Sequence, residues 1–254
     1  MPRIRLIIEY DGTNYRGWQN QPNGLAVQEV LERELEKLTG ERIVIHASGR
    51  TDSGVHARAQ VAHFDTLSSI PADKFCYALN VGLPADVRII YSDSVYENFH
   101  ARFCVKKKHY RYAIWHAPHA SALNARTTLH IHTTLDYDNI NVAAKDIIGT
   151  HDFRAFKAAG VELNDTVRTI YESNWSVNGR LVTYDVIGSG FMYNMVRILV
   201  GTMIEIGQGR RDKDSLKTAL STLNRSDAGA TAPAHGLMLM GVEYADGFNT
   251  RDYV

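Results

Sequence analysis

Residues 167–187 have the sequence VRTIYESNWSVNGRLVTYDVI, which predicts a β-hairpin. Two runs rich in β-branched and aromatic residues flank the pair Asn178-Gly179, and an Asn-Gly pair in this setting is a strong signal for a tight antiparallel turn. The rest of the chain mixes expected strands and helices without the regular strand–helix alternation of a doubly wound parallel sheet. The sequence therefore predicts an α+β fold with a mixed, largely antiparallel sheet.

The spacing of apolar residues predicts the other elements. Helices are expected over residues 27–38, 71–80, 136–148, 191–206 and 214–223. Glycines that are placed to end three of them are Gly40, Gly149 and Gly207. Strands are expected over residues 4–10, 43–47, 60–66, 106–115 and 237–244. Each half of the chain then runs roughly strand, helix, strand, strand, so we expect two similar α/β halves, residues 1–105 and 106–254.

The composition is that of an ordinary globular protein. Of the 254 residues, 44% are hydrophobic and 22% are charged, and no apolar run approaches the roughly 20 residues that span a bilayer. The N-terminus lacks the apolar stretch of a secretory signal, and Cys76 and Cys104 form no Cys-x-x-Cys motif. We therefore expect a cytoplasmic protein without a membrane segment, a disulfide framework or a thiolate zinc site.

The charge balance excludes a strongly basic nucleic-acid-binding chain. Lys plus Arg and Asp plus Glu both number 28, so any RNA binding must come from local clusters of cations. One cluster without an acid spans residues 102–111, and it contains Arg102, Lys106, Lys107, Lys108 and Arg111. On charge alone a solvated, lysine-protected strand edge is the favoured interpretation of this cluster.

A glycine-rich segment, GRTDSGVHA at residues 49–57, separates two expected strands and carries Asp52. Glycines at both ends let the backbone turn sharply, and a carboxylate on such a turn is well placed to act as a nucleophile or base. The alternative is a polar turn in which Asp52 caps backbone amides. The triplet Asp52-Ser53-Gly54 also occurs in aspartic proteases, but those enzymes need a second such carboxylate, and the sequence has no second Asp-Ser/Thr-Gly.

Arg197 interrupts the expected helix 191–206, which is apolar on nearly every side and should be buried. A buried guanidinium needs a partner, because leaving it unpaired costs several kcal/mol. Asp52 is one candidate, while a structural acid elsewhere or backbone carbonyls are the alternatives. On the strand 106–115, Tyr110 shares a face with two lysines, which suits a stacked nucleobase beside its phosphates and suits a half-buried core tyrosine equally well.

These segments together resemble the tRNA pseudouridine synthase A family. Further family-like pieces are YDGTNYRGWQ at 10–19, GTHDFRAF at 149–156, FMYNMVR at 191–197 with Gly201, and GLML at 236–239. The resemblance implies two α/β halves that share one sheet, with a central catalytic cleft between them, and a homodimer that binds tRNA.

The resemblance also implies roles for individual residues. Asp52 is expected to be catalytic, Arg197 to pair with its carboxylate, Tyr110 to pack against the target base, and Arg50 to contact the extruded nucleotide. Members of the bacterial branch isomerise uridine to pseudouridine at positions 38 to 40 of the anticodon arm. His109 stands where Lys or Arg is commoner, which would make part of the RNA contact sensitive to pH.

No cofactor is expected, because isomerisation neither adds nor removes atoms and the sequence has no nucleotide-binding glycine loop or metal motif. His130 and His132 share a strand face but lack a third ligand nearby. The candidates for phosphate contacts are Lys106, Lys107, Lys108, Arg210 and Arg211. A solvated loop explains the last two equally well. Competing functions are a non-catalytic RNA-binding protein with RNA-recognition-like halves and a carboxylate hydrolase such as a glycosidase, although no paired acid is evident.

Overall fold

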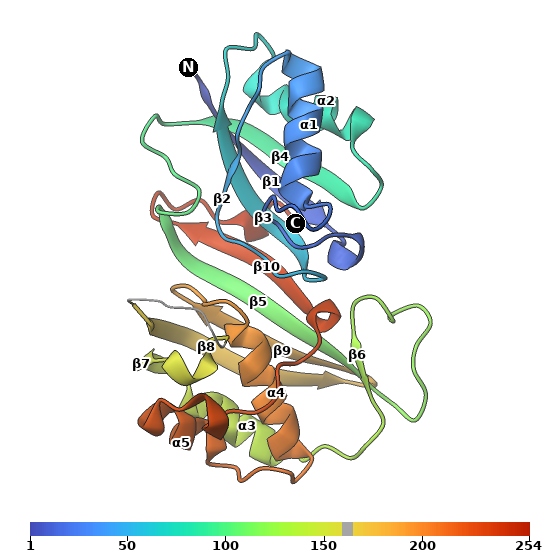
Figure 1. Ribbon diagram of the computed structural model, residues 1–254, viewed down its shortest axis with the longest axis vertical. Helices are drawn as coiled ribbons and strands as arrows, with labels where there is room; N and C mark the ends of the chain where they lie inside the picture. Colours follow the sequence, from blue (N-terminus) through green and yellow to red (C-terminus); the bar gives the residue numbers. More distant parts are fainter. Residues whose placement is uncertain (159–164) are drawn as a thin grey trace. The chain divides into compact units, whose positions relative to one another are not determined.

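The computed structural model of the protein describes residues 1–158 and 165–254 (Figure 1). The chain forms two compact units, the first made of residues 1–108 with 238–254 and the second of residues 109–237. The sequence predicted a single boundary between two halves, after residue 105. The C-terminal tail instead returns to the first unit, because its strand pairs in parallel with an early strand at Met238 and His56. No helix in the described ranges is both long and apolar enough to cross a membrane.

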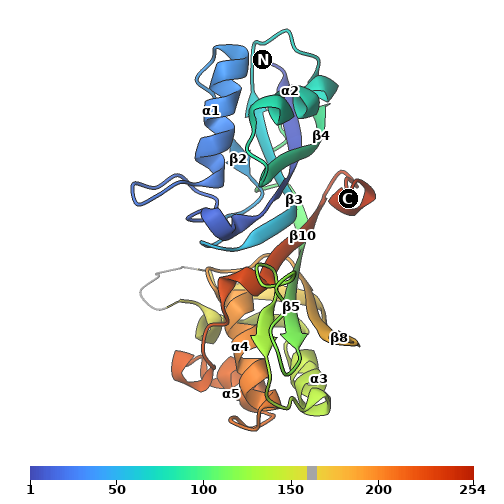
Figure 2. The ribbon, with the colours of Figure 1, turned by 90° about the vertical axis from the view of Figure 1, so that its right-hand side faces the viewer.

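The first unit contains strands in the order β4-β1-β3-β10. Their bounds are β1 Arg3–Tyr10, β3 His56–Asp65, β4 Val87–Val95 and β10 Leu237–Tyr244, and the short β2, His46–Ala47, pairs with β3. Strand β1 is antiparallel to both β3 and β4. Helices α1 (Val27–Thr39) and α2 (Phe75–Gly82) lie over one face of these strands (Figure 2). Gly40 ends α1 with a φ of 73°, as predicted.

Strand β1 is buried on both faces. Ile4, Leu6 and Ile8 are buried on one face, and Arg5 on the other is only 5% exposed. Its guanidinium donates two hydrogen bonds to the Asp93 carboxylate and lies 3.3 Å from the centre of the Phe248 ring. The pairing offsets the cost of burying a charge, and Phe248 of the C-terminal segment covers the Arg5 side chain.

The second unit contains strands in the order β5-β9-β8-β7. Their bounds are β5 Val105–His116, β7 Gly149–Asp152, β8 Val167–Asn178 and β9 Leu181–Gly188, and β6, Leu129–Ile131, runs parallel to β5. The hairpin of β8 and β9 is confirmed, with Gly179 and Arg180 as its two-residue loop and a φ of 58° at Gly179. The fold class is therefore the predicted one, a mixed and mostly antiparallel α+β protein.

Helices α3 (Tyr137–Asp146), α4 (Met195–Gly207) and α5 (Ser215–Thr222) belong to the second unit. The sequence started α4 at residue 191 and ended it on Gly207. The helix begins four residues later because Asn194 has a left-handed φ of 62°, a conformation that asparagine tolerates better than most residues. Gly209, with a φ of 68°, makes the final turn. Gly207 stays helical and permits close packing, since a Cβ there would lie 2.3 Å from Ile140 Cδ1.

The expected strand 43–47 is reduced to β2, His46–Ala47. Ile43 and Ile45 are buried as their alternation predicts. The backbone amide of Ile45, however, donates to the Glu32 carboxylate of α1 at 3.0 Å instead of to a neighbouring strand. The Glu32 side chain thus accepts the hydrogen bond that a neighbouring strand would accept in a sheet. The alternating pattern of apolar residues does not distinguish these two partners.

Candidate active site

Asp52 lies half-buried on a tight turn between β2 and β3 in the first unit. The amide of Val55 donates to the Asp52 carbonyl at 3.1 Å, which closes the turn, and Gly54 supplies a φ of 78°. Glycine is favoured over other residues at positions with a positive φ, because it has no Cβ. Gly54 of the GRTDSGVHA segment thus shapes the turn that carries the carboxylate.

A second loop, residues 11–18, clamps the Asp52 turn by its backbone. The amide of Trp18 donates to the Thr51 carbonyl at 3.1 Å, and the amide of Gly54 donates to the Tyr15 carbonyl at 3.3 Å. Gly17 allows the close approach, because a Cβ at that position would lie 2.5 Å from the Thr51 oxygen. The family-like segment at residues 10–19 is therefore part of the mount of Asp52.

Buried side chains hold the turn from beneath. The hydroxyls of Thr51 and Tyr10 form a hydrogen bond of 2.7 Å, and both residues are buried. Burial raises the pKa of Tyr10 well above its ordinary value, while hydrogen bonding to Thr51 and Gln60 opposes the rise. The Tyr10 phenol therefore remains protonated and able to share this hydrogen bond at neutral pH.

The start of the loop is held by Gln60 and Lys108. The Lys108 ammonium donates to the Ser48 carbonyl at 2.7 Å, and the Gln60 amide donates to the Gly49 carbonyl at 2.9 Å. The Ser48 hydroxyl in turn donates to Gln60 Oε1 at 2.6 Å. Arg50, which follows these anchored residues, is exposed. The structure thus gives Lys108 a contact with the segment that leads to Asp52, which the sequence did not predict.

The other two lysines of the basic strand differ from Lys108 and from each other. Lys107 forms an ion pair of 3.2 Å with Glu243 of β10, whereas Lys106 is exposed. His109 follows Lys108 directly, and its Nε2 lies 2.5 Å from the Asp185 carboxylate. Asp185 also accepts two hydrogen bonds from Arg111. Burial acts to raise the pKa of Asp185, but these two partners outweigh it and the pKa is lowered. The phosphate contacts of the lysines stay a prediction.

Tyr110 and Arg197 lie in the second unit. Tyr110 is 8% exposed and its ring makes an edge-to-face contact with Phe191, with centroids 5.3 Å apart. Arg197 is half-buried in the first turn of α4, not in the middle of a longer helix. Its Nε donates to the Ala232 carbonyl at 2.7 Å and its Nη1 to the Asn194 side chain at 2.8 Å. A backbone carbonyl, one of the expected alternatives, is thus a partner of this guanidinium, and the pairing with Asp52 stays a prediction.

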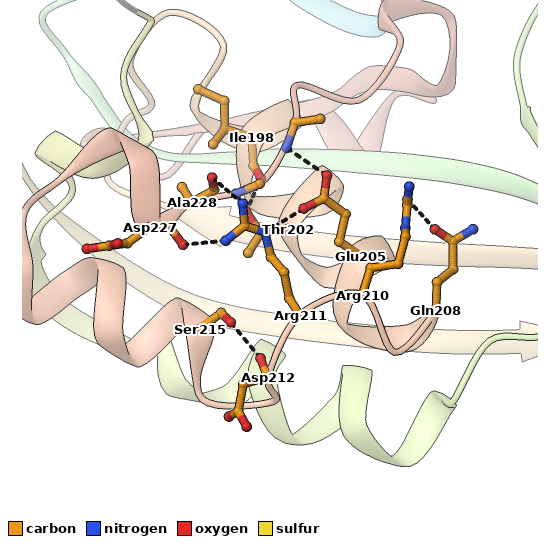
Figure 3. Close-up of polar contacts among 12 residues, drawn as sticks. Ile198, Thr202, Glu205, Gln208, Arg210, Arg211, Asp212, Ser215, Asp227 and Ala228 are labelled. Carbon is orange, nitrogen blue, oxygen red and sulfur yellow. Dashed lines mark hydrogen bonds and ion pairs between the residues drawn. The ribbon is translucent and has the colours of Figure 1, made fainter.

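The two arginines after α4 have different surroundings (Figure 3). Arg210 is exposed and hydrogen-bonds to the side chain of Gln208. Arg211 is turned towards Glu205 of α4 and donates to its carboxylate. Within residues 1–158 and 165–254, no group of three or more His, Cys, Asp or Glu side chains is arranged to hold a metal ion.

A rigidly mounted carboxylate whose loop is held by a lysine of a basic strand fits an enzyme that acts on an anionic polymer. Residues 6–104 and 143–245 match the family model described as tRNA pseudouridine synthase, and the chain belongs to this family. It is 46% identical to the tRNA pseudouridine synthase A of Acetivibrio thermocellus, over 96% of this chain and all of that one.

Two further relatives carry the same name. The protein of Ruminiclostridium cellulolyticum is 47% identical over 96% of this chain and 100% of its own, and that of Bacillus subtilis is 44% identical over 95% and 99%. Among solved structures, the archaeal box H/ACA sRNP Nop10-Cbf5 complex aligns with a TM-score of 0.37 at 11% identity, over 79% of this chain and 44% of that one. That likeness is too distant to bear on function.

Proposed function

We propose that this chain isomerises uridine to pseudouridine at positions 38 to 40 in the anticodon stem-loop of tRNA, with Asp52 as the catalytic residue. The observation that carries the proposal is the way in which the Asp52 turn is held. The backbone of residues 11–18 is hydrogen-bonded to the turn, and Lys108 is hydrogen-bonded to the segment that leads into it. Membership of an isomerase family supports this reaction over the non-catalytic RNA-binding alternative.

The reaction needs a fixed carboxylate and a site that excludes water. The bond from ribose C1′ to uracil N1 breaks, the base turns, C1′ joins C5, and the proton of C5 is lost to solvent while N1 gains one. Asp52 attacks or deprotonates, with Arg197 stabilising its ionised form. Tyr110 packs against the base, and Arg50 contacts the extruded nucleotide. No atom is added overall and no electron is gained or lost, so the chemistry requires no redox cofactor.

The partner is tRNA. Phosphate contacts by Lys106, Lys107, Lys108 and Arg210 would make the affinity for tRNA fall steeply with salt, whereas Arg211 is bonded to Glu205 and to two backbone carbonyls of its own chain. The active form is a homodimer in the cytoplasm. The resemblance of the sequence to its family supports the tRNA partner, the homodimer and the cytoplasmic location. The exposed position of cations such as Lys106 supports the phosphate contacts.

Release of tritium from uracil-5-tritiated, unmodified tRNA tests the proposal, with no cofactor or metal added. Wild type should release tritium and Asp52→Asn should not, although its tRNA affinity should stay within about threefold of wild type. Asp73→Asn is the matched control, because that carboxylate is 64% exposed and lies in a different segment. Substantial release by Asp52→Asn would remove the catalytic assignment. A wild type that binds tRNA and releases nothing would support the non-catalytic alternative.

A further inference from the structure

We propose that Arg211 is a positioning residue for Arg197, and not a phosphate contact. It would act through Glu205 and through residues 227–232, which we call the α4 strap. The inference rests on the proposed role of Arg197 in the isomerisation. All of the residues concerned lie in the second unit.

Arg211 uses all three of its guanidinium nitrogens inside the protein (Figure 3). Nε donates to the Glu205 carboxylate, Nη1 donates to the Asp227 carbonyl at 3.1 Å, and Nη2 donates to the Ala228 carbonyl at 3.1 Å. The planar guanidinium therefore joins α4 to the first residues of the strap. A lysine could keep the contact with Glu205 but could not reach both carbonyls in the same way.

The strap is then bonded to α4 step by step. The amide of Gly229 donates to Thr202 Oγ1 at 2.8 Å, and the amide of Ala230 donates to Glu205 Oε1 at 3.1 Å. The amide of Ala232 donates to the Arg197 carbonyl at 3.0 Å. The partners of these three amides all lie on α4, at Thr202, Glu205 and Arg197.

Close packing leaves the strap little room to move. A Cβ at Gly201 of α4 would lie 1.8 Å from the Ala230 oxygen, and a Cβ at Gly229 would lie 2.7 Å from Glu205 Oε2. The strap thus lies directly on the helix surface. Its last carbonyl, that of Ala232, accepts the Arg197 Nε at 2.7 Å, so the position of the strap sets the position of this guanidinium.

The partly buried Glu205 carboxylate is stabilised by its ion pair with Arg211. Burial acts to raise the pKa of Glu205, but Arg211 and the Ala230 amide outweigh it and lower the pKa. If Arg211 turned outward to a phosphate, the half-buried carboxylate would lose its cation, which is costly. Arg210 makes no such contact with the strap in the part of the chain that the structure describes, and it remains the better candidate for phosphate.

The test compares Arg211→Lys, Glu205→Gln, their double variant and Arg210→Ala. Tritium release gives kcat and KM for tRNA, and binding at several salt concentrations gives the log–log slope of affinity against salt. All assays are run well below the thermal midpoint of each variant. We expect Arg211→Lys and Glu205→Gln each to lower kcat about 10- to 100-fold, with KM within about twofold and the salt slope unchanged. The double variant should lose no more than the worse single variant, because both break one connection. Arg210→Ala should weaken binding and reduce the slope by about one.

Two results would overturn the proposal. If Arg211→Lys or Glu205→Gln lowers only the thermal midpoint and keeps the wild-type kcat, the connection is structural and does not position Arg197. If Arg211→Lys raises KM and flattens the salt slope as Arg210→Ala does, Arg211 is a phosphate contact. Glu205→Gln retains an acceptor for Ala230 and serves as the test if Arg211→Lys does not fold. A wild type without tritium release would refute the proposed function itself, and this inference with it.

Discussion

Gly17→Ala should inactivate the enzyme by moving the Asp52 turn, without touching a residue that meets the substrate. Gly17 has a φ of 88°, and a Cβ there would lie 2.5 Å from the Thr51 oxygen and 3.1 Å from the Asp52 carbonyl carbon. Both neighbours are backbone atoms, so neither can swing aside as a side chain would. Either the 11–18 loop or the turn has to shift.

The size of the effect follows from two separate contributions. Holding alanine at positive φ costs about 1–2 kcal/mol. In a chain of this size that corresponds to a fall of roughly 2–8 °C in the thermal midpoint. The contact must also open from 2.5 Å to an ordinary 3.4 Å, a displacement of about 0.9 Å at the residue next to Asp52. A misplacement of about 1 Å can lower the rate about 100-fold.

Gly40→Ala is the matched control for the first contribution. Gly40 also has a positive φ, 73°, but a Cβ there would meet nothing within 4 Å. Tritium release from tRNA and thermal unfolding are measured for both variants. Gly17→Ala should be destabilised at least as much as Gly40→Ala, because the contact with the Thr51 backbone adds to the cost of positive φ. Only Gly17→Ala should lose kcat, by about two orders of magnitude, with tRNA affinity largely kept.

Two outcomes would refute this reasoning. A Gly17→Ala enzyme with wild-type kcat would mean that the turn tolerates the shift, so its clamp does not set the position of Asp52. An equal loss of kcat in Gly40→Ala would mean that general destabilisation, and not the contact with Thr51, causes the loss.

Two further predictions concern charge. Lys106→Ala should weaken tRNA binding and reduce the salt slope by about one. Lys108→Ala should also lower kcat, because it removes the donor to the Ser48 carbonyl. Identical kinetic effects in the two variants would contradict these different roles of the two lysines. Burial, with nearby His100, Arg3 and His46, lowers the pKa of His63 from 6.5 to about 4. The unfolded chain therefore takes up the proton first as pH falls through this window, so stability is lost from pH 6.5 towards 4. The thermal midpoint should fall less steeply there in His63→Gln, and parallel curves would count against the assignment.

The elements that the sequence predicted well depend on neighbouring residues. Gly40 ends α1 because the left-handed conformation is a local property of glycine, and the β8–β9 hairpin follows from Asn178-Gly179 between two apolar runs. Even there the loop is Gly179-Arg180, one residue later than the pair suggested. The choice is made by cross-strand pairing, which a turn signal alone does not determine.

The start of α4 could not be predicted from the local pattern of apolar residues. Met192 is buried and continues the apolar pattern towards the N-terminus, but it lies outside the helix, because Asn194 adopts a left-handed conformation. Burial by tertiary packing and burial on a helix face give the same composition, so periodicity cannot separate them. The parallel pairing of β10 with β3 joins residues some 180 positions apart, and nothing in either segment alone specifies it.

The candidate site divides in a similar way. Asp52, Tyr110 and Arg197 are predicted from the motifs that resemble the family, and their roles stay predictions. Arg210 and Arg211 are neighbours of the same type, and only the backbone turn after Gly209 decides that one is exposed and the other reaches Glu205. The direction of a side chain in a loop depends on that turn, which the sequence does not state.

The two segments that carry Asp52 and Arg197 are built on one physical plan. In each, a second stretch of chain is hydrogen-bonded along the functional segment, and a glycine lets the backbones approach: Gly17 at the Asp52 turn and Gly201 under the α4 strap. Such contacts fix a side chain before substrate arrives, so less reorganisation is needed during the reaction. This explains why the family-like segments extend well beyond the residues that we propose to act in the reaction. Their glycines and amides hold Asp52 and Arg197 in place, and substitutions there should lower kcat although they never meet the RNA.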